Sequence, residues 1–306
     1  MYEYDKRVVL TLDAGGTNFV FSAIQGNNEM ISPIGLPAVS DNLDECLEVL
    51  VKGFDRVIAA IPVPPVAISF AFPGPADYEN GIIGDLPNFP SFRGGVALGP
   101  FLKHKYGIPV FIENDGNLFA YGEALSGALP MINRELSLAG CSREYKNLIG
   151  ITLGTGFGAG VVINKVLLTG DNGCGGDIWL MRNKKYPDML AEESVSIRAV
   201  RRVYSDLSGQ SSASLSPKDI YDIAEGIKEG NRHAAIASFN ELGMMAGAAI
   251  ASVLNVVDGL VVIGGGVAGA SKYILPALIT ELRAQLTTFS GNKFPCVSMQ
   301  VYNGED

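Results

Sequence analysis

The sequence has few of the residues that build zinc or disulfide sites. It contains four cysteines among 306 residues, and none of them has the C-x₂₋₄-C spacing typical of zinc ligands. Scattered thiols are typical of a reducing compartment, where a buried free cysteine packs as a small apolar residue. We therefore expect no zinc site and a cytoplasmic location. The four are Cys46, Cys141, Cys174 and Cys296.

Positive charge is also scarce. The chain has 23 Lys and Arg against 32 Asp and Glu, a net charge of −9, whereas a nucleic-acid surface needs a basic footprint. The N-terminal residues MYEYDKR lack the apolar core of a signal peptide. The longest apolar run, 244–263, is interrupted by Asn255 and Asp258, so it indicates a helix, a turn and a strand more than a membrane span. We expect neither nucleic acid nor membrane as a partner.

The chain is rich in glycine, with 37 residues, and three glycine turns each follow a run of β-branched residues. Glycine lets the backbone approach a phosphate closely, and its free N–H groups can bind the anion. There is no G-x-x-x-x-G-K-[ST] loop, and the first two turns lead into strands instead of helices, unlike a dinucleotide fingerprint. We expect one nucleotide held between two lobes by amides and a metal ion. The predicted ATP-binding residues are Asp13, Gly15, Gly16, Thr17, Asn18, Gly154, Thr155, Gly156, Gly264, Gly265 and Gly266.

A strand, a glycine turn and a second strand, which together indicate a β-hairpin, occur twice, about 140 residues apart. This repeat predicts two related α/β lobes. We place the smaller lobe at 1–117 and the larger at 118–306. Asp41 is the expected N-cap of the first helix. The predicted strands are 7–12, 19–24, 66–70, 110–112, 148–153, 159–163 and 260–263, and the predicted helices are 41–54, 114–126, 216–227, 234–254 and 272–286.

Two aspartates follow predicted strands and carry the expected chemistry. Asp13 can hold Mg²⁺ through water, although Asp and Gly are also common in ordinary turns. Asp115 begins a helix, whose positive end favours an ionised carboxylate. An ionised carboxylate there can accept a proton from an attacking hydroxyl as a general base. The alternative is that Asp115 only caps the helix.

Five motifs in order resemble the ROK family of sugar kinases: residues 13–17, 72–92, 113–123, 154–162 and 255–267. The resemblance implies the actin-like ATPase (ribonuclease H-like) fold, α/β, with two lobes and a cleft between them. It also implies ATP and Mg²⁺, transfer of the γ-phosphate to a hexose hydroxyl, usually on C6, and a homodimer. The sugar-binding residues that it implies are Gly74, Asn88, Asn114, Asp115, Asp177 and Glu192, with Asp115 as the base. Asn114 and Asn88 could each instead be a turn residue.

The chain departs from the family pattern after residue 175. The family has G-E-I-G-H-M followed by a cysteine-rich zinc loop, and its His contacts both sugar and zinc. Here Asp177 replaces the Glu, Leu180 stands in place of the His, and the cysteines are missing. Trp179 could stack on a sugar or belong to the core. Ser196, four residues after Glu192, matches the serine of the family pattern.

These departures leave the identity of the sugar open. Glucose is the first expectation, and an N-acetylhexosamine or fructose are alternatives. A sugar-binding sensor with impaired catalysis is a second class of function. A transcriptional regulator is a third class. We do not expect it, because a regulator of this family carries a DNA-binding helix-turn-helix before the first glycine turn, and only 12 residues precede Asp13 here. The family pattern also continues past a strand like 297–306 into a further helix, whereas this sequence ends at Asp306.

Overall fold

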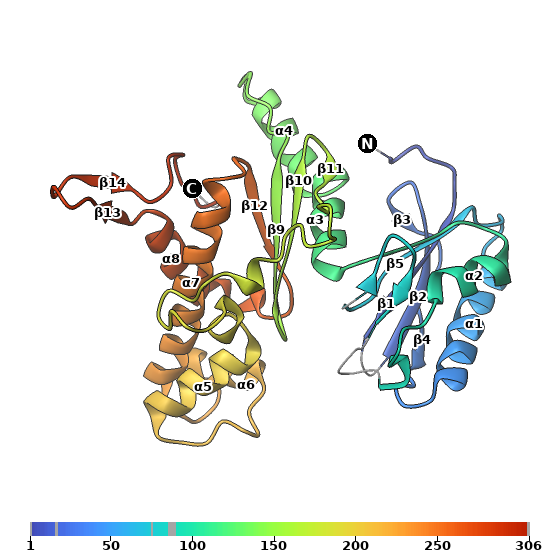
Figure 1. The fold of residues 1–306 in the computed structure, drawn as a ribbon, viewed down its shortest axis with the longest axis horizontal. Helices are drawn as coiled ribbons and strands as arrows, with labels where there is room; N and C mark the ends of the chain where they lie inside the picture. The colour runs from blue at the N-terminus through green and yellow to red at the C-terminus, as the bar shows by residue number, and fades with distance from the viewer. Residues whose placement is uncertain (1, 16–17, 75, 85–89, 305–306) are drawn as a thin grey trace. The chain divides into compact units, whose positions relative to one another are not determined.

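Two units make up the chain in the computed structural model, which describes residues 2–15, 18–74, 76–84 and 90–304 (Figure 1). Unit 1 comprises residues 1–118, 125–130 and 171–173. Unit 2 comprises residues 119–124, 131–170 and 174–306. Each unit has its own sheet and its own hydrophobic core.

The sheet of unit 1 has the strand order β3-β2-β1-β5-β8, with β4 paired to β2. β1 and β2 form the predicted antiparallel hairpin, whereas β1–β5 and β5–β8 are parallel. The strands are β1 Val9–Ala14, β2 Asn18–Gln25, β3 Asn28–Glu29, β4 Ile34–Pro37, β5 Ala67–Ala71 and β8 Val110–Glu113. A separate two-stranded sheet consists of β6 Ala76–Asp77 and β7 Ile82–Ile83.

The register of the parallel strands aligns their carboxyl ends. Asp13 of β1 pairs with Ala71 of β5, and Ala71 pairs with Glu113 of β8. In open α/β sheets, ligands bind outside the carboxyl ends of the strands. The row from Asp13 to Glu113 is therefore where unit 1 is expected to place its chemistry.

Helix α1, Leu43–Ala60, begins two residues after the start of the predicted range 41–54 and extends further. Its N-cap is Asn42 and not Asp41, because Asn42 Oδ1 accepts from the Glu45 N–H at 3.3 Å. The helix buries a stripe at helical spacing, which contains Cys46, Leu50, Phe54 and Val57. A second helix of unit 1, α2 Leu98–Tyr106, is absent from the sequence prediction.

The core of unit 1 is aromatic. Phe54 of α1 packs edge-on against Phe21 of β2, with ring centroids 5.1 Å apart, and phenylalanines of β2 and β5 continue the cluster. Cys46 is completely buried there, and burial raises the pKa of its thiol to about 11. It therefore packs as a neutral apolar group, as predicted, whereas Cys141 and Cys174 are exposed and do not fit that prediction.

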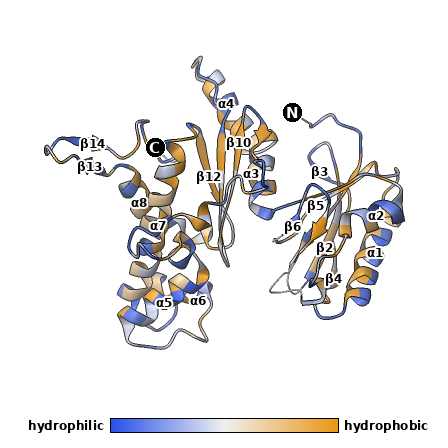
Figure 2. Ribbon diagram, in the orientation of Figure 1, coloured by the Kyte–Doolittle hydropathy of each residue, from blue (hydrophilic) through white to orange (hydrophobic). Residues whose placement is uncertain are grey.

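The sheet of unit 2 has the order β11-β10-β9-β12, and Figure 2 shows apolar residues concentrated on it. β9 and β10 form the second predicted hairpin, and β12 runs parallel to β9. The strands are β9 Leu148–Leu153, β10 Phe157–Ile163, β11 Val166–Leu167 and β12 Leu260–Gly264. The helices are α3 Asp115–Leu125 and α4 Ala128–Leu138, each with residues in both units, and α5 Ile197–Ser208, α6 Pro217–Glu225, α7 Arg232–Leu254 and α8 Ser271–Leu282.

Helix α7 is long and apolar enough to cross a membrane by length and composition alone. However, 67% of its most apolar window is buried inside the protein. It packs against α5, α6 and α8, and its buried residues belong to the core of unit 2. This packing accounts for the apolar run seen in the sequence.

The C-terminal part of the chain differs from the prediction. Helix α8 ends at Leu282, not near residue 286, and the next residues form a hairpin of β13 Gln285–Thr287 and β14 Lys293–Pro295. The hairpin turns at Gly291, which has φ +86°. Residues 297–304, which resemble a strand in the sequence, form none in this described segment.

Helix α6 offers a test of local stability in unit 2. Ser216 Oγ accepts from the Asp219 N–H at 3.1 Å, and the Asp219 carboxylate accepts from the Ser216 N–H at 2.7 Å, a capping box. We expect Ser216→Ala to lower the free energy of unfolding by about 1 kcal/mol, measured by urea denaturation. The control is Ser214→Ala, which changes an exposed serine before the cap. Equal stability of the two variants would contradict the assigned cap.

The same cap predicts a pH dependence. Hydrogen bonds from Lys228 and then from Ser216 hold the pKa of Asp219 below its usual value of 3.8. A carboxylate with a depressed folded-state pKa contributes stability above its unfolded-state pKa. That contribution is therefore present at neutral pH and disappears as the pH falls from 3.8 through the lower folded-state value.

Candidate functional site

The carboxyl edge of the unit 1 sheet carries both predicted aspartates. Asp13 is the penultimate residue of β1, and Asp115 follows β8 by two residues. Both side chains are exposed. Two strand spacings separate β1 from β8, so Asp13 Cα and Glu113 Cα lie about 10 Å apart. The structure thus places the predicted base and the predicted metal ligand at one edge of one sheet.

The start of α3 shows which residue caps the helix. Asn114 Oδ1 accepts from the Gly116 N–H at 2.9 Å and from the Asn117 N–H at 3.4 Å, so Asn114 has the capping role. Asp115 is the first residue of α3, and its Oδ1 accepts from the Gly116 N–H at 2.8 Å. Asp115 is therefore not needed as the N-cap.

Glu113 and Asn117 support this helix start and are absent from the sequence-based site. Glu113 Oε1 accepts from the Asn114 N–H at 2.8 Å and from Asn117 Nδ2 at 3.1 Å. Asn117 is 6% exposed, and its Oδ1 has no partner among the described residues. Both belong to the motif Glu113–Asn117, so their polar character next to Asp115 was the available signal.

The first glycine turn is described in part. A Cβ at Gly15 would lie 2.9 Å from the Asn18 carbonyl oxygen, so the two ends of the turn lie too close together for a side chain at this position. Asn18 is exposed and begins β2. The predicted ligands Gly16 and Thr17, and the predicted sugar contact Asn88, lie outside the described residues.

Gly74, another predicted sugar contact, lies beside Tyr78. A Cβ at Gly74 would lie 2.9 Å from the Tyr78 hydroxyl oxygen. That hydroxyl donates to the Phe72 carbonyl at 3.0 Å. A side chain at position 74 would therefore disturb the segment directly after β5.

The second and third glycine turns lie side by side in unit 2. Gly264, at the end of β12, pairs with Thr152 of β9. Beyond the strands, the Val267 N–H donates to the Leu153 carbonyl at 3.0 Å. Gly265 has φ +89°, a left-handed conformation that favours glycine. The predicted residues Gly154, Thr155, Gly156, Gly265 and Gly266 are thus brought to one end of this sheet.

Glu192 contacts the second glycine turn directly. Its Oε2 accepts from the Phe157 N–H at 3.0 Å, and a Cβ at Gly156 would lie only 2.4 Å from that same oxygen. Its Oε1 accepts from Arg198 Nη2 at 2.8 Å, and Arg198 also binds Glu193 at 2.7 Å. Both bonds raise the pKa of the Arg198 guanidinium, and the bond to Glu193 has the larger effect. The sequence predicts Glu192 as a sugar contact and gives no role to Arg198.

Asp177 is exposed and precedes a short 3₁₀ helix, Ile178–Leu180. Trp179 is half-buried and packs against the core of unit 2, which agrees with a core role. Leu180, in place of the family His, is 54% exposed. Among the described residues there is no group of three or more His, Cys, Asp or Glu that could hold a metal ion.

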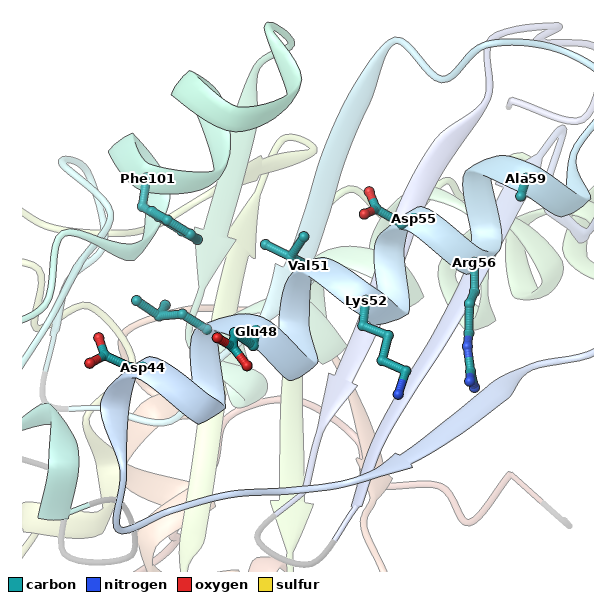
Figure 3. Close-up of a pocket in the computed structure, with 9 residues that line it drawn as sticks. Asp44, Glu48, Val51, Lys52, Asp55, Arg56, Ala59 and Phe101 are labelled. Carbon is teal, nitrogen blue, oxygen red and sulfur yellow. The ribbon is translucent and has the colours of Figure 1, made fainter.

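A groove of about 760 Å³ lies away from these residues, on the outer side of α1 in unit 1 (Figure 3). Phe101 of α2 faces Val51 of α1 across it. Charged residues of α1, such as Asp44, Lys52 and Asp55, form its rim. None of the predicted site residues lines this groove, so its size does not make it the functional site.

Comparison with known proteins identifies the family. The ROK family model matches residues 9–302, nearly the whole chain. The chain belongs to the ROK family. In solved structures, this ROK protein is similar to the glucokinase of Parabacteroides distasonis, with 67% identity and a TM-score of 0.85, over 92% of this chain and 79% of that one. The predicted family and the actin-like ATPase fold are thereby confirmed.

Two further relatives are named for different functions. The glucokinase of Thermotoga maritima is 26% identical over 290 residues, which are 89% of this chain and 86% of that protein. The xylose repressor of Bacillus subtilis is 24% identical over 262 residues, or 81% of this chain. The match spans 61% of the repressor's length.

Proposed function

We propose that this ROK protein phosphorylates a hexose hydroxyl with ATP, with C6 of glucose as the first expected acceptor. The observation that carries the proposal is the position of Asp115. It begins α3 at the carboxyl edge of the unit 1 sheet, while Asn114 supplies the cap. The 67% identity to a protein named glucokinase supports the same reaction.

In this proposal Asp115 is the general base. As the sugar oxygen attacks the γ-phosphorus of ATP, its proton passes to the Asp115 carboxylate, and ADP leaves with the electron pair of the broken P–O bond. The exposed carboxylate is reachable by a sugar, and the helix start favours its charge. Gly74, Asn88 and Asn114, together with Asp177 and Glu192, are the proposed sugar contacts.

The glycine turns at 13–18, 153–158 and 264–266 would supply amides to the phosphates. Glycine at positions 15, 156 and 265 is required by close contacts inside the protein, with the Asn18 carbonyl, the Glu192 carboxylate and the Leu153 backbone. Asp13 suits Mg²⁺, which is commonly bound by one or two carboxylates plus water and substrate phosphates. When bound, the ion would neutralise charge on the phosphates. No zinc is required by this proposal.

An ATP-consumption assay tests the proposal. Hexoses and N-acetylhexosamines are offered one by one with ATP and Mg²⁺, and ADP formation is followed. We expect turnover with at least one hexose and loss of turnover when EDTA removes Mg²⁺. The panel also distinguishes glucose from fructose and from N-acetylhexosamine as acceptor.

A second candidate is a sugar-binding sensor with impaired catalysis. Leu180 in place of the family His and the similarity to a xylose repressor favour it. Calorimetric sugar binding without turnover on any sugar of the panel would support the sensor and reject the kinase. The intact Asp115 favours the kinase.

The ligands proposed are a hexose and ATP. We also propose that the protein is a cytoplasmic homodimer without nucleic-acid or membrane partners, as the family resemblance and the net charge of −9 suggest. Sedimentation at several protein concentrations would test the dimer.

A further inference from the structure

One seven-residue segment of unit 2 holds both ends of the second glycine turn. At the start of the turn, the Gly154 carbonyl accepts from the Ile197 N–H at 2.9 Å. At its end, the Phe157 N–H donates to Glu192 Oε2 at 3.0 Å. Between these two contacts, the Gly154 N–H donates to the Gly156 carbonyl at 3.1 Å. Segment 192–198 therefore contacts the turn at both of its ends.

Glu192 contacts the hairpin at Phe157, the first residue of β10. Phe157 pairs with Leu153 in the β9–β10 hairpin, and the Leu153 carbonyl also accepts from the Val267 N–H at 3.0 Å. The Glu192 carboxylate accepts from the Phe157 N–H, and a buried N–H without an acceptor is costly. The missing Cβ at Gly156 leaves the space for the Glu192 carboxylate.

Arg198 determines where the Glu192 carboxylate lies. Its Nη2 donates to Glu192 Oε1, the oxygen that does not contact the turn. The carboxylate is thus held at both oxygens, by the turn on one side and by the guanidinium on the other. An ionised carboxylate has about four lone-pair sites. Two are occupied by these contacts, so capacity remains for a sugar hydroxyl.

We propose that Arg198 is a positioning residue, which orients Glu192 and through it keeps the second glycine turn in its phosphate-binding shape. This inference rests on the proposed function, in which the turn contacts ATP and Glu192 contacts the sugar. It predicts that the arginine affects the use of ATP although it need not touch either substrate.

The test compares substitutions of Arg198 with a substitution of its other partner, Glu193. We expect Arg198→Gln to lower kcat/KM for ATP about tenfold, the size of one lost charge-assisted hydrogen bond. Arg198→Lys should recover part of this loss because it keeps the charge. The matched control is Glu193→Gln, which removes the other partner of the same arginine, a side chain 44% exposed. We expect it to change kcat/KM less than about twofold.

A double-mutant cycle separates positioning from a merely structural role. If Arg198 acts through Glu192, then Arg198→Gln has no further effect on kcat/KM in a Glu192→Gln background. Equal effects in both backgrounds, or an effect of Glu193→Gln as large as that of Arg198→Gln, would overturn the inference.

Hydrogen exchange makes the test independent of catalysis. We expect Arg198→Gln to speed amide exchange in the peptide that contains 153–158, while the melting temperature stays unchanged. Unchanged exchange in this peptide would refute the positioning role. If the unaltered protein has no turnover, the proposed function fails, yet the exchange measurement still decides the role of Arg198.

Discussion

Asp115→Asn is expected to reduce kcat about 10³-fold, within the range of 10²–10⁴ attributed to general acid–base catalysis. This corresponds to about 4 kcal/mol of lost transition-state stabilisation. The amide has nearly the same size and can still accept from the Gly116 N–H, as Asp115 does now. Because only the base is removed, the KM for the sugar should change by less than about threefold. Steady-state kinetics with the best sugar of the panel measures both quantities.

The matched control is Asp44→Asn, which changes an acid of the same unit that lines the α1 groove and is not a site residue. It should keep the activity of the unaltered protein. Thermal melting of Asp115→Asn must also match, since Asn114 supplies the cap of α3. Near-normal turnover of Asp115→Asn would remove Asp115 from the catalytic role and, with it, the mechanism proposed here.

The residues that follow predictable strands were found from the sequence. Short β-branched runs predicted strands at 7–12 and 110–112, directly before Asp13 and Glu113, and the parallel register of β1, β5 and β8 in the structure brings their carboxyl ends together. Periodicity located α1, α6 and α7 within a few residues at their beginnings. These features depend on local patterns, which a sequence displays directly.

Contacts between distant segments could not be predicted in this way. Glu192 and Phe157 are 35 residues apart, and nothing in either motif indicates that the carboxylate accepts from that N–H. The role of Arg198 depends on the same contact, so it was missed as well. Similarly, the capping role of Asn114 depends on the exact start of α3, which a pattern places only to within a few residues.

Helix α5 was missed although its pattern is readable. Its buried residues Ala199, Val200, Val203 and Tyr204 have helical spacing, but three arginines share the same stretch. Here the charged residues lie on the other face, and one of them is Arg198. In an amphipathic helix of this kind, the apolar face packs on the core and the charged face can bind nearby acids.

Gly265→Ala is expected to lower the free energy of unfolding by about 3 kcal/mol or more, because strain and a backbone clash add. At φ +89° an L-residue is strained. The new Cβ would also lie 2.4 Å from the Leu153 carbonyl oxygen and 2.7 Å from the Leu153 nitrogen. Neither atom can move alone, since both belong to the backbone of β9. Urea denaturation followed by tryptophan fluorescence and by circular dichroism measures the loss.

The clash should also lower activity, because of its position. Leu153 immediately precedes the second glycine turn, and its carbonyl also accepts from the Val267 N–H. A backbone shift there would displace Gly154 and weaken ATP binding, so the KM for ATP should rise even at a temperature where the variant is folded. Gly269→Ala is the control, because a Cβ there meets nothing within 4 Å and its φ is not positive. If Gly265→Ala were as stable and as active as Gly269→Ala, the contact between the third glycine turn and the end of β9 could not be as described. The close approach of these two turns would then lose its proposed role in holding the nucleotide.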